Sequence, residues 1–206
     1  EKKGFLLVDS GATYMDGTTD ITRTYPLGPL TEDEKRFYTW TLQSHIDLAK
    51  AVWLDYCECK MIDTIAREPL WRHLINYRCG TGHSVSFVGN VHEGPHSLRG
   101  TNSVLMRPGM VITDEPGVYE TDLVGIRIEN ELVCVHKADN QYGTFLGFEP
   151  LMFVPIATSP ILPGVLDKDE IAWLNDYHRQ VFAKLAPHLN DEERSWLAEK
   201  CAAIGC

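Results

Sequence analysis

The sequence predicts an α+β fold in which antiparallel strands are flanked by helices and followed by a helical extension. Residues 5–9 and 21–25 have the patterns of short strands, and a capping box at Thr31 opens a long helical pattern. Strand-like segments recur over 110–156, and helical spacing returns after residue 167. With 206 residues, 44% of them hydrophobic, the chain is long enough to bury a sizeable core.

The first two strands are expected to pair antiparallel, joined by the Gly- and Thr-rich stretch 10–19. Asp9 leaves one strand and Asp20 enters the other, so we expect their carboxylates to meet near the loop end. The capping box Thr31–Glu34 then predicts a helix that runs to about Tyr56.

A second helical stretch covers roughly 60–77, where Pro69 is expected to mark a fresh N-terminus or a kink rather than mid-helix. The stretch 80–109 is rich in Gly, His, Ser and Asn and has no sustained periodicity, which is typical of a functional or disordered loop. The remaining strand-like segments are 110–114, 123–135 and 145–156.

Two faces are predicted for the strand near residue 128. Ile126 and Ile128 share one face, whereas Arg127, Glu129 and Glu131 share the other. Arg127 would therefore lie beside Glu129, where its guanidinium would hold the carboxylate in position.

After Pro163 the composition changes to two probable helices, 167–185 and 190–203. The first of them has amphipathic spacing, formed by Ile171, Leu174, Tyr177, Val181 and Phe182. We interpret both helices as an appendage that packs on the sheet or serves in self-association.

Charge and composition exclude several classes of protein. A net charge of −10 argues against a nucleic-acid partner, because phosphate binding needs concentrated Lys and Arg. No stretch approaches the roughly 20 apolar residues that span a bilayer. The six cysteines form no CxxC pair, which favours reduced thiols in a cytoplasmic protein over a disulfide framework.

Four carboxylates and one imidazole stand in distinctive local sequences: Asp9, Asp20, His83, Glu115 and Glu129. An oxygen-rich set with a single histidine is the ligand chemistry of a paired divalent-metal site. Without metal, the same carboxylates close together would repel, and some would bind protons. The set therefore points to a metallohydrolase.

Each of these residues has a simpler alternative. Asp9 and Asp20 stand in sequences typical of turn or cap residues. Glu115, which precedes Pro-Gly, is by itself equally weak evidence for metal binding. Glu129 is harder to dismiss because it places a charge in a well-patterned strand, and His83 lies among glycines that permit close approach to a ligand. The joint order Asp, Asp, His, Glu, Glu carries most of the argument.

That order resembles the C-terminal catalytic part of aminopeptidase P (Xaa-Pro aminopeptidase), a pita-bread enzyme family related to methionine aminopeptidases, prolidases and creatinases. The resemblance covers residues from about 6 to about 196, with eleven positions from Asp9 to Asp20 and fourteen from Glu115 to Glu129. Its specific segments are DSGATYMDGTTDITRT, GTGHSVSFVGNVHEGP, ITDEPGVY, GIRIENE and DEIAWLNDYHRQV.

The resemblance implies part of a pita-bread fold, with a curved antiparallel sheet flanked by helices. Residues 1–157 would be the C-terminal portion of the catalytic domain, and residues 158–206 its helical extension. Because the chain starts with Glu-Lys-Lys directly before a strand, we expect it to lack an N-terminal part that supplies about half of the sheet and another substrate-contacting histidine.

The resemblance also assigns metal ligands. Asp9 would bind one ion, Asp20 and Glu129 would bridge two, and His83 with Glu115 would complete the other ion's shell. Manganese is the first choice, and zinc or cobalt is possible, since affinity order alone does not fix the metal used in a cell. Such ions would activate a shared water for attack on a peptide carbonyl.

The resemblance also assigns roles in catalysis and substrate binding. His92 would contact substrate and stabilise the oxyanion, Arg127 would stand behind Glu129, and Glu115 would relay a proton to the leaving nitrogen. Cys79 departs from the family pattern, because the family commonly has His at this substrate-binding position. The substitution would affect which substrate side chains the enzyme prefers. The remaining histidines are expected to be surface or structural residues.

The implied activity is hydrolysis of the bond between an N-terminal residue and a following proline, in a homodimer. A prolidase acting only on Xaa-Pro dipeptides is the nearest rival, and the helical tail argues against it. A non-catalytic pita-bread binding module, or an inactive fragment, remains the alternative from another class.

Overall fold

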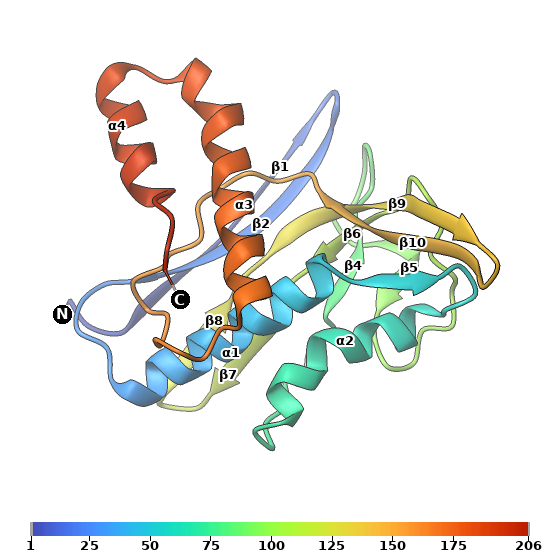
Figure 1. Cartoon of the computed structure of the whole chain (residues 1–206), viewed down its shortest axis with the longest axis horizontal. Coiled ribbons are helices and arrows are strands. Elements are labelled where there is room, and N and C mark those ends of the chain that lie inside the picture. Colours follow the sequence, from blue (N-terminus) through green and yellow to red (C-terminus); the bar gives the residue numbers. More distant parts are fainter. Residues whose placement is uncertain (1, 206) are drawn as a thin grey trace.

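The computed structural model describes residues 2–205, in which antiparallel strands form one six-stranded sheet and two hairpins (Figure 1). The six-stranded sheet has the order β3-β10-β9-β6-β4-β5, and the hairpins are β1-β2 and β7-β8. The strands are β1 (Phe5–Tyr14), β2 (Gly17–Pro26), β3 (Val52–Leu54), β4 (Gly82–Ser84), β5 (Glu93–Leu98), β6 (Val111–Asp114), β7 (Gly117–Glu120), β8 (Val124–Arg127), β9 (Asn130–Asn140) and β10 (Gly143–Pro150). The helices are α1 (Glu32–Ala49), α2 (Cys59–Trp71), α3 (Lys168–Leu185) and α4 (Asp191–Lys200), with a 3₁₀ turn at Ala186–His188.

The first hairpin is longer than predicted. The strands pair from Phe5 with Pro26 to Tyr14 with Gly17, so the expectation of a connection over 10–19 is wrong. Its threonines suit a strand because their branched side chains pack well on a pleated surface. The close turn ends at Gly17, whose φ of 146° favours glycine.

The longer hairpin also moves the two aspartates. Asp9 pairs with Thr22 and Asp20 pairs with Gly11, so both lie well inside the hairpin, away from its loop. Their positions are diagonal on one face of the hairpin.

Helix α1 begins as predicted and ends earlier. Both hydrogen bonds of the capping box at Thr31 are present, but the helix ends at Ala49, whereas Tyr56 was expected. The chain then enters β3, which pairs with β10 and buries Trp53 in the core. Strand pairing with a distant segment therefore overrides the local helical pattern.

Helix α2 contains Pro69, and the helix ends at Trp71, before the predicted end near residue 77. The interpretation of Pro69 as a fresh N-terminus is wrong. Since proline lacks an N–H and crowds the preceding turn, its position close to the helix end limits the damage to the last turn.

Besides β3, three further strands were not predicted. The stretch 80–109 contains β4 and β5, which add to the edge of the large sheet next to β6. Strand β7 pairs with β8 in the second hairpin. These strands are three to six residues long, so their periodicity was too short to recognise in the sequence.

The predicted strand 123–135 is split in two. Strand β8 ends at Arg127 and β9 begins at Asn130, because the backbone N–H of Glu129 donates to the Thr22 carbonyl of β2 at 3.1 Å. Ile126 and Ile128 are both fully buried in one apolar cluster, as their shared face predicted.

Helices and sheet enclose two main apolar clusters. One lies between α2, the end of α1 and the six-stranded sheet, with Leu48, Ile62 and Leu146 among its members. The other joins α1, β8 and α3 around Leu42, Ile126 and Leu174. Figure 1 shows α1 and α2 side by side along the strands.

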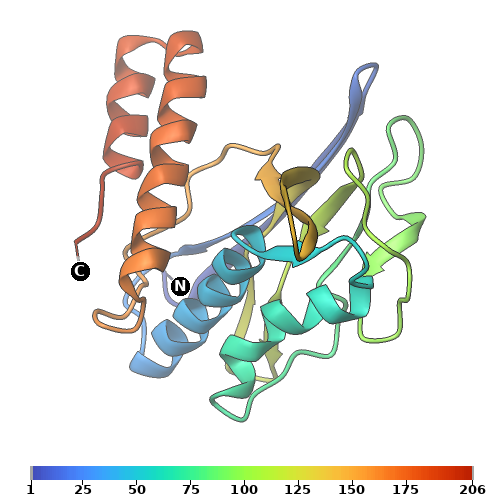
Figure 2. The ribbon, with the colours of Figure 1, turned by 45° about the vertical axis from the view of Figure 1, so that its right-hand side comes forward.

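Two helices, α3 and α4, lie near the C-terminal end of the described residues. Each begins with a capping box, at Asp167 for α3 and at Asn190 for α4. Figure 2 shows the two helices packed as a pair at one end of the molecule. The apolar side of α3, including Leu174 and Val181, is buried against the second cluster, which secures the helices to the rest of the chain.

Two further expectations concern the thiols and the membrane. The cysteines within residues 2–205 are free, namely Cys57, Cys59, Cys79, Cys134 and Cys201, whereas Cys206 lies outside the described residues. Over the same range, the helices are too short or too polar to cross a bilayer.

His178 on α3 makes the docking of this helix sensitive to acid. Its ring is fully buried, and its Nε2 accepts a hydrogen bond from the Ile156 backbone N–H at 3.1 Å. Burial and the nearby Arg23 lower the pKa of His178 from 6.5 to about 4. The folded state thus prefers the neutral ring, so its contribution to stability is complete above about pH 6.5 and declines as pH falls towards 4.

We therefore expect the free energy of unfolding to fall by at most about 3 kcal/mol between pH 6.5 and 4 on account of His178. In His178→Gln, which keeps a hydrogen-bond acceptor without the titration, this part of the pH dependence should disappear. Urea unfolding at several pH values measures it, with exposed His136→Gln as the matched control. Parallel pH profiles for wild type and His178→Gln would contradict the assignment.

Candidate metal centre

Three potential metal ligands converge from separate elements. Asp20 comes from β2, His83 from β4, and Glu129 from the junction of β8 and β9. Each offers one ligand atom, and these atoms all lie within 4.8 Å of one another. All three residues are buried, Glu129 almost completely at 1% exposure.

Glu115 lies next to this group, just after β6. Its Oε1 is 3.1 Å from His83 Nε2, which is also 3.5 Å from Asp20 Oδ2. Thr113, two residues earlier and within β6, donates to Glu115 Oε1 at 3.0 Å and accepts from the His83 backbone N–H at 3.0 Å. One hydroxyl therefore fixes both Glu115 and His83.

Asp9 stands apart from the other four predicted ligands. Its carboxylate forms an ion pair with Arg127 and is about half exposed. Its position on the hairpin is nevertheless diagonal to that of Asp20. The structure thus brings four of the five predicted ligands together and places the fifth on the Arg127 side of the group.

The electrostatics of the group favour a bound cation. Burial and the neighbouring Glu115 carboxylate raise the pKa of Glu129 to about 8. Burial alone would lower the pKa of His83, but hydrogen bonds with Asp20 and Glu115 raise it to about 10. Both residues thus hold protons where a metal ion would provide the positive charge instead. Oxygen donors with one imidazole fit a hard or borderline divalent ion.

Thr22 and Arg127 hold Glu129 in place. The Thr22 hydroxyl donates to Glu129 Oε2 at 2.5 Å and accepts from Arg127 Nε at 3.0 Å. Arg127 Nε itself lies 3.9 Å from Glu129 Oε2, so the arginine supports the carboxylate mainly through Thr22. Arg127 also donates to the Tyr119 hydroxyl at 2.7 Å.

Sequence reasoning missed Thr22 and Thr113. A signal was present, because each is two residues from a predicted ligand along a strand and therefore shares its face. A threonine in a strand is so common that the pattern alone does not distinguish a supporting hydroxyl from an ordinary strand residue.

His92 and Cys79 flank the group. The His92 ring packs on the His83 ring, with centroids 3.7 Å apart. The Cys79 thiol lies 3.7 Å from the Gly117 carbonyl oxygen, and burial together with Glu115 raises its pKa. Both residues therefore border the group without belonging to it.

A buried polar network supports the group from behind. Arg23 donates to the Glu129 carbonyl oxygen at 2.5 Å, to Asn130 Oδ1 at 2.8 Å and to the Tyr177 hydroxyl at 2.9 Å. His45 lies on the helical side, where its Nδ1 is 3.0 Å from Asp114 Oδ2 and 3.3 Å from the Asp114 backbone oxygen. Helix α3 is thereby connected through Tyr177 and Arg23 to the backbone of Glu129.

Removing the Thr22 hydroxyl should weaken metal binding. In Thr22→Val, which keeps the shape of the side chain, Glu129 and Arg127 lose their shared partner, and metal affinity should fall about 10- to 100-fold. Metal content after dialysis against a graded chelator measures the change. Thr64→Val, on the exposed side of α2, is the control and should bind metal like wild type. Equal metal retention in both variants would refute the supporting role of Thr22.

Comparison with known proteins places this arrangement in a family. The sequence profile of metallopeptidase family M24 matches residues 1–136, and that of the C-terminal region of peptidase M24 matches residues 144–204. Aminopeptidase P1 of Lotus japonicus is 42% identical over 97% of the chain, and aminopeptidase P2 of Arabidopsis thaliana is 44% identical over 93%. The chain spans only 31% and 28% of these relatives.

Solved structures agree. X-prolyl aminopeptidase from Caenorhabditis elegans, described as a cytosolic enzyme with a di-nuclear active site, superposes with a TM-score of 0.91 over 97% of this chain and 33% of that one, at 39% identity. Prolidase from Pyrococcus furiosus gives a TM-score of 0.62 over 72% of this chain and 41% of that one, at 28% identity. The expected α+β pita-bread fold, present in part, is confirmed.

The chain has a buried group of Asp, His and Glu, and the M24 profile matches its residues 1–136. This chain belongs to the metallopeptidase family M24.

Proposed function

We propose that the protein carrying this chain is a dinuclear-metal aminopeptidase that hydrolyses the bond between an N-terminal residue and a following proline. The observation that carries this proposal is the buried group of Asp20, His83 and Glu129, with Glu115 beside it. The relatives that match nearly the whole chain are named aminopeptidase P or X-prolyl aminopeptidase, which supports the same reaction.

Five residues of the chain would hold the two ions: Asp9, Asp20, His83, Glu115 and Glu129. Manganese is our first choice, and zinc or cobalt suits the same donors. When bound, divalent ions supply an activated water and polarise the peptide carbonyl. The di-nuclear site of the C. elegans enzyme supports a pair of ions. Asp9 is included because it lies diagonal to Asp20 on the hairpin.

The chain's other residues would handle charge and protons. His92, packed on the ring of His83, would donate a hydrogen bond to the oxyanion that develops on the carbonyl, an interaction worth about 2.7–4 kcal/mol in other hydrolases. Glu115 would carry a proton towards the leaving proline nitrogen. Arg127 would position Glu129 through Thr22, and Cys79 would border the bound peptide.

Two rivals remain. A prolidase is disfavoured because the Pyrococcus prolidase covers 72% of this chain, whereas the X-prolyl aminopeptidase covers 97% and includes the C-terminal helices. A non-catalytic binding module is disfavoured because all five proposed ligands are present, and four of them converge.

The proposal extends to the assembly and the location of the protein. Because the matched relatives are about three times longer than this chain, activity would need the remaining part of the enzyme. A homodimer stays a prediction. A cytoplasmic location is supported by the C. elegans relative, which is described as cytosolic.

Matched peptides test the reaction. The metal-loaded protein should release Arg from Arg-Pro-Pro and leave Arg-Ala-Pro intact, as read by mass spectrometry. Glu129→Gln should abolish release and lower metal content, whereas Glu149→Gln, exposed on β10, should change neither. Cleavage of Arg-Pro without Arg-Pro-Pro would establish the prolidase instead. No cleavage by folded, metal-loaded protein would favour the binding module.

His92 has a separate kinetic signature. In His92→Ala, kcat should fall about 10²- to 10³-fold with little change in KM, because the lost hydrogen bond strengthens only as the oxyanion develops. His188→Ala, in the turn between α3 and α4, is the matched control and should keep wild-type kinetics. A large rise in KM at unchanged kcat would show that His92 contributes only to binding.

A further inference from the structure

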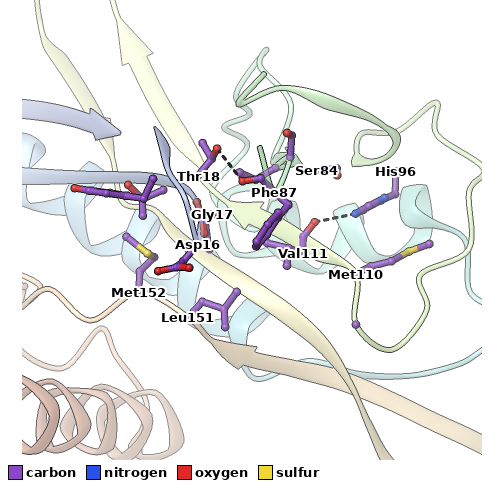
Figure 3. Close-up of a pocket in the computed structure, with 16 residues that line it drawn as sticks. Asp16, Gly17, Thr18, Ser84, Phe87, His96, Met110, Val111, Leu151 and Met152 are labelled. Atoms are coloured by element: carbon purple, nitrogen blue, oxygen red, sulfur yellow. Dashed lines mark hydrogen bonds between the residues drawn. The ribbon is translucent and has the colours of Figure 1, made fainter. Parts of the chain in front are cut away.

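A cavity of about 850 Å³ adjoins the metal-ligand group (Figure 3). Its walls come from the tip of the β1-β2 hairpin, the segment after β4, the start of β6 and residues 151–152. Two lining residues lie next to proposed ligands in the chain, Ser84 after His83 and Glu131 two positions after Glu129. Thr19, which precedes Asp20, also lines the cavity, so three ligand-bearing segments contribute to its wall.

The walls are mainly apolar, and the charged groups on them are acidic. Figure 3 shows Phe87, Met110 and Met152 along the cavity, with Asp16 at the hairpin tip. Among the described residues, no Lys or Arg lines the cavity. His96 is occupied on one side, because its Nε2 bonds the Val111 carbonyl oxygen at 2.8 Å. A ligand with an apolar stem and a cationic head complements such a surface.

Two residues of this wall have a buried polar atom without a hydrogen-bond partner, Glu131 Oε1 and His96 Nδ1. Of the two, only Glu131 can carry a negative charge. Glu131 is only 4% exposed, and its Oε1 has no hydrogen-bond partner. The nearby guanidinium of Arg127 pairs with Asp9 and approaches Glu115 and Glu129. Leaving a buried acceptor without a donor is unfavourable, so a ligand that supplies a donor would be favoured.

We propose that this cavity binds a basic side chain, Lys or Arg, on the first residue of the substrate, with Glu131 accepting its cationic head. The methylene stem would pack on Phe87 and Met110. This inference rests on the proposed function. We assign the cation to the first residue of the substrate, because the second residue is proline and its side chain carries no charge.

Side-chain selection differs from binding of the N-terminal amine. The amine is common to every peptide substrate, so a carboxylate that binds it raises the rates for all first residues alike. A carboxylate that binds the side chain separates arginine from citrulline, which has nearly the same shape and no charge. The ratio of the two rates therefore reports the contact itself.

The test compares kcat/KM for Arg-Pro-Pro and citrulline-Pro-Pro, using the full metal-loaded protein. Wild type should favour arginine at least about tenfold, the factor that corresponds to 1.4 kcal/mol, within the range of one hydrogen bond to a charged group. In Glu131→Gln the ratio should fall to within about twofold of one. In Asp16→Asn, where the carboxylate is exposed at the cavity rim and screened by solvent, most of the ratio should remain.

Any other result of this comparison contradicts a specific part of the proposal. A wild-type ratio near one refutes the basic-side-chain site, and this comparison needs no variant to fold. A ratio that survives Glu131→Gln, or a loss of both rates with the ratio kept, removes Glu131 from side-chain recognition. Absence of cleavage of both peptides by metal-loaded wild type refutes the proposed function itself, and the inference with it.

Discussion

The site depends on the contact between β2 and the junction of β8 and β9. The Glu129 backbone N–H donates to the Thr22 carbonyl, the Thr22 hydroxyl donates to the Glu129 carboxylate, and Arg23 donates to the Glu129 carbonyl. Three hydrogen bonds thus fix one residue to a strand that is over a hundred positions away in the chain. Without this contact, Asp20 and Glu129 would have no defined separation.

Holding acidic side chains together in a buried site has an electrostatic cost. This cost is seen in the raised pKa of Glu129, since burial and the Glu115 carboxylate both disfavour the ionised form of Glu129. A divalent cation relieves this cost, which links metal binding to the stability of the site. The same reasoning explains the surrounding hydroxyls of Thr22 and Thr113, which keep the carboxylates oriented.

The C-terminal helices are also connected to the site. Tyr177 of α3 accepts a hydrogen bond from Arg23, and Arg23 contacts the backbone of Glu129. The M24 C-terminal profile covers these helices, over residues 144–204. Their buried side chains complete the apolar cluster behind β8, so they support the ligand-bearing junction as well as extending the chain.

The sequence by itself determined the α+β class, the starts of three helices and the set of candidate ligands. Capping boxes are local, since Thr31 and Asp167 bond residues only three positions away, and such signals are readable without a fold. The ligand set was recognised from residue type and order, and four of its members meet in the structure.

Tertiary structure decided what depends on distant partners. The extended first hairpin, strand β3 and the break before Asn130 each arise from pairing with another segment. The pairing of Asp9 with Arg127, the role of Thr22 and the buried oxygen of Glu131 follow from the same cause. Burial and hydrogen bonding between segments far apart in the chain leave almost no local periodicity, so only the folded arrangement could specify them.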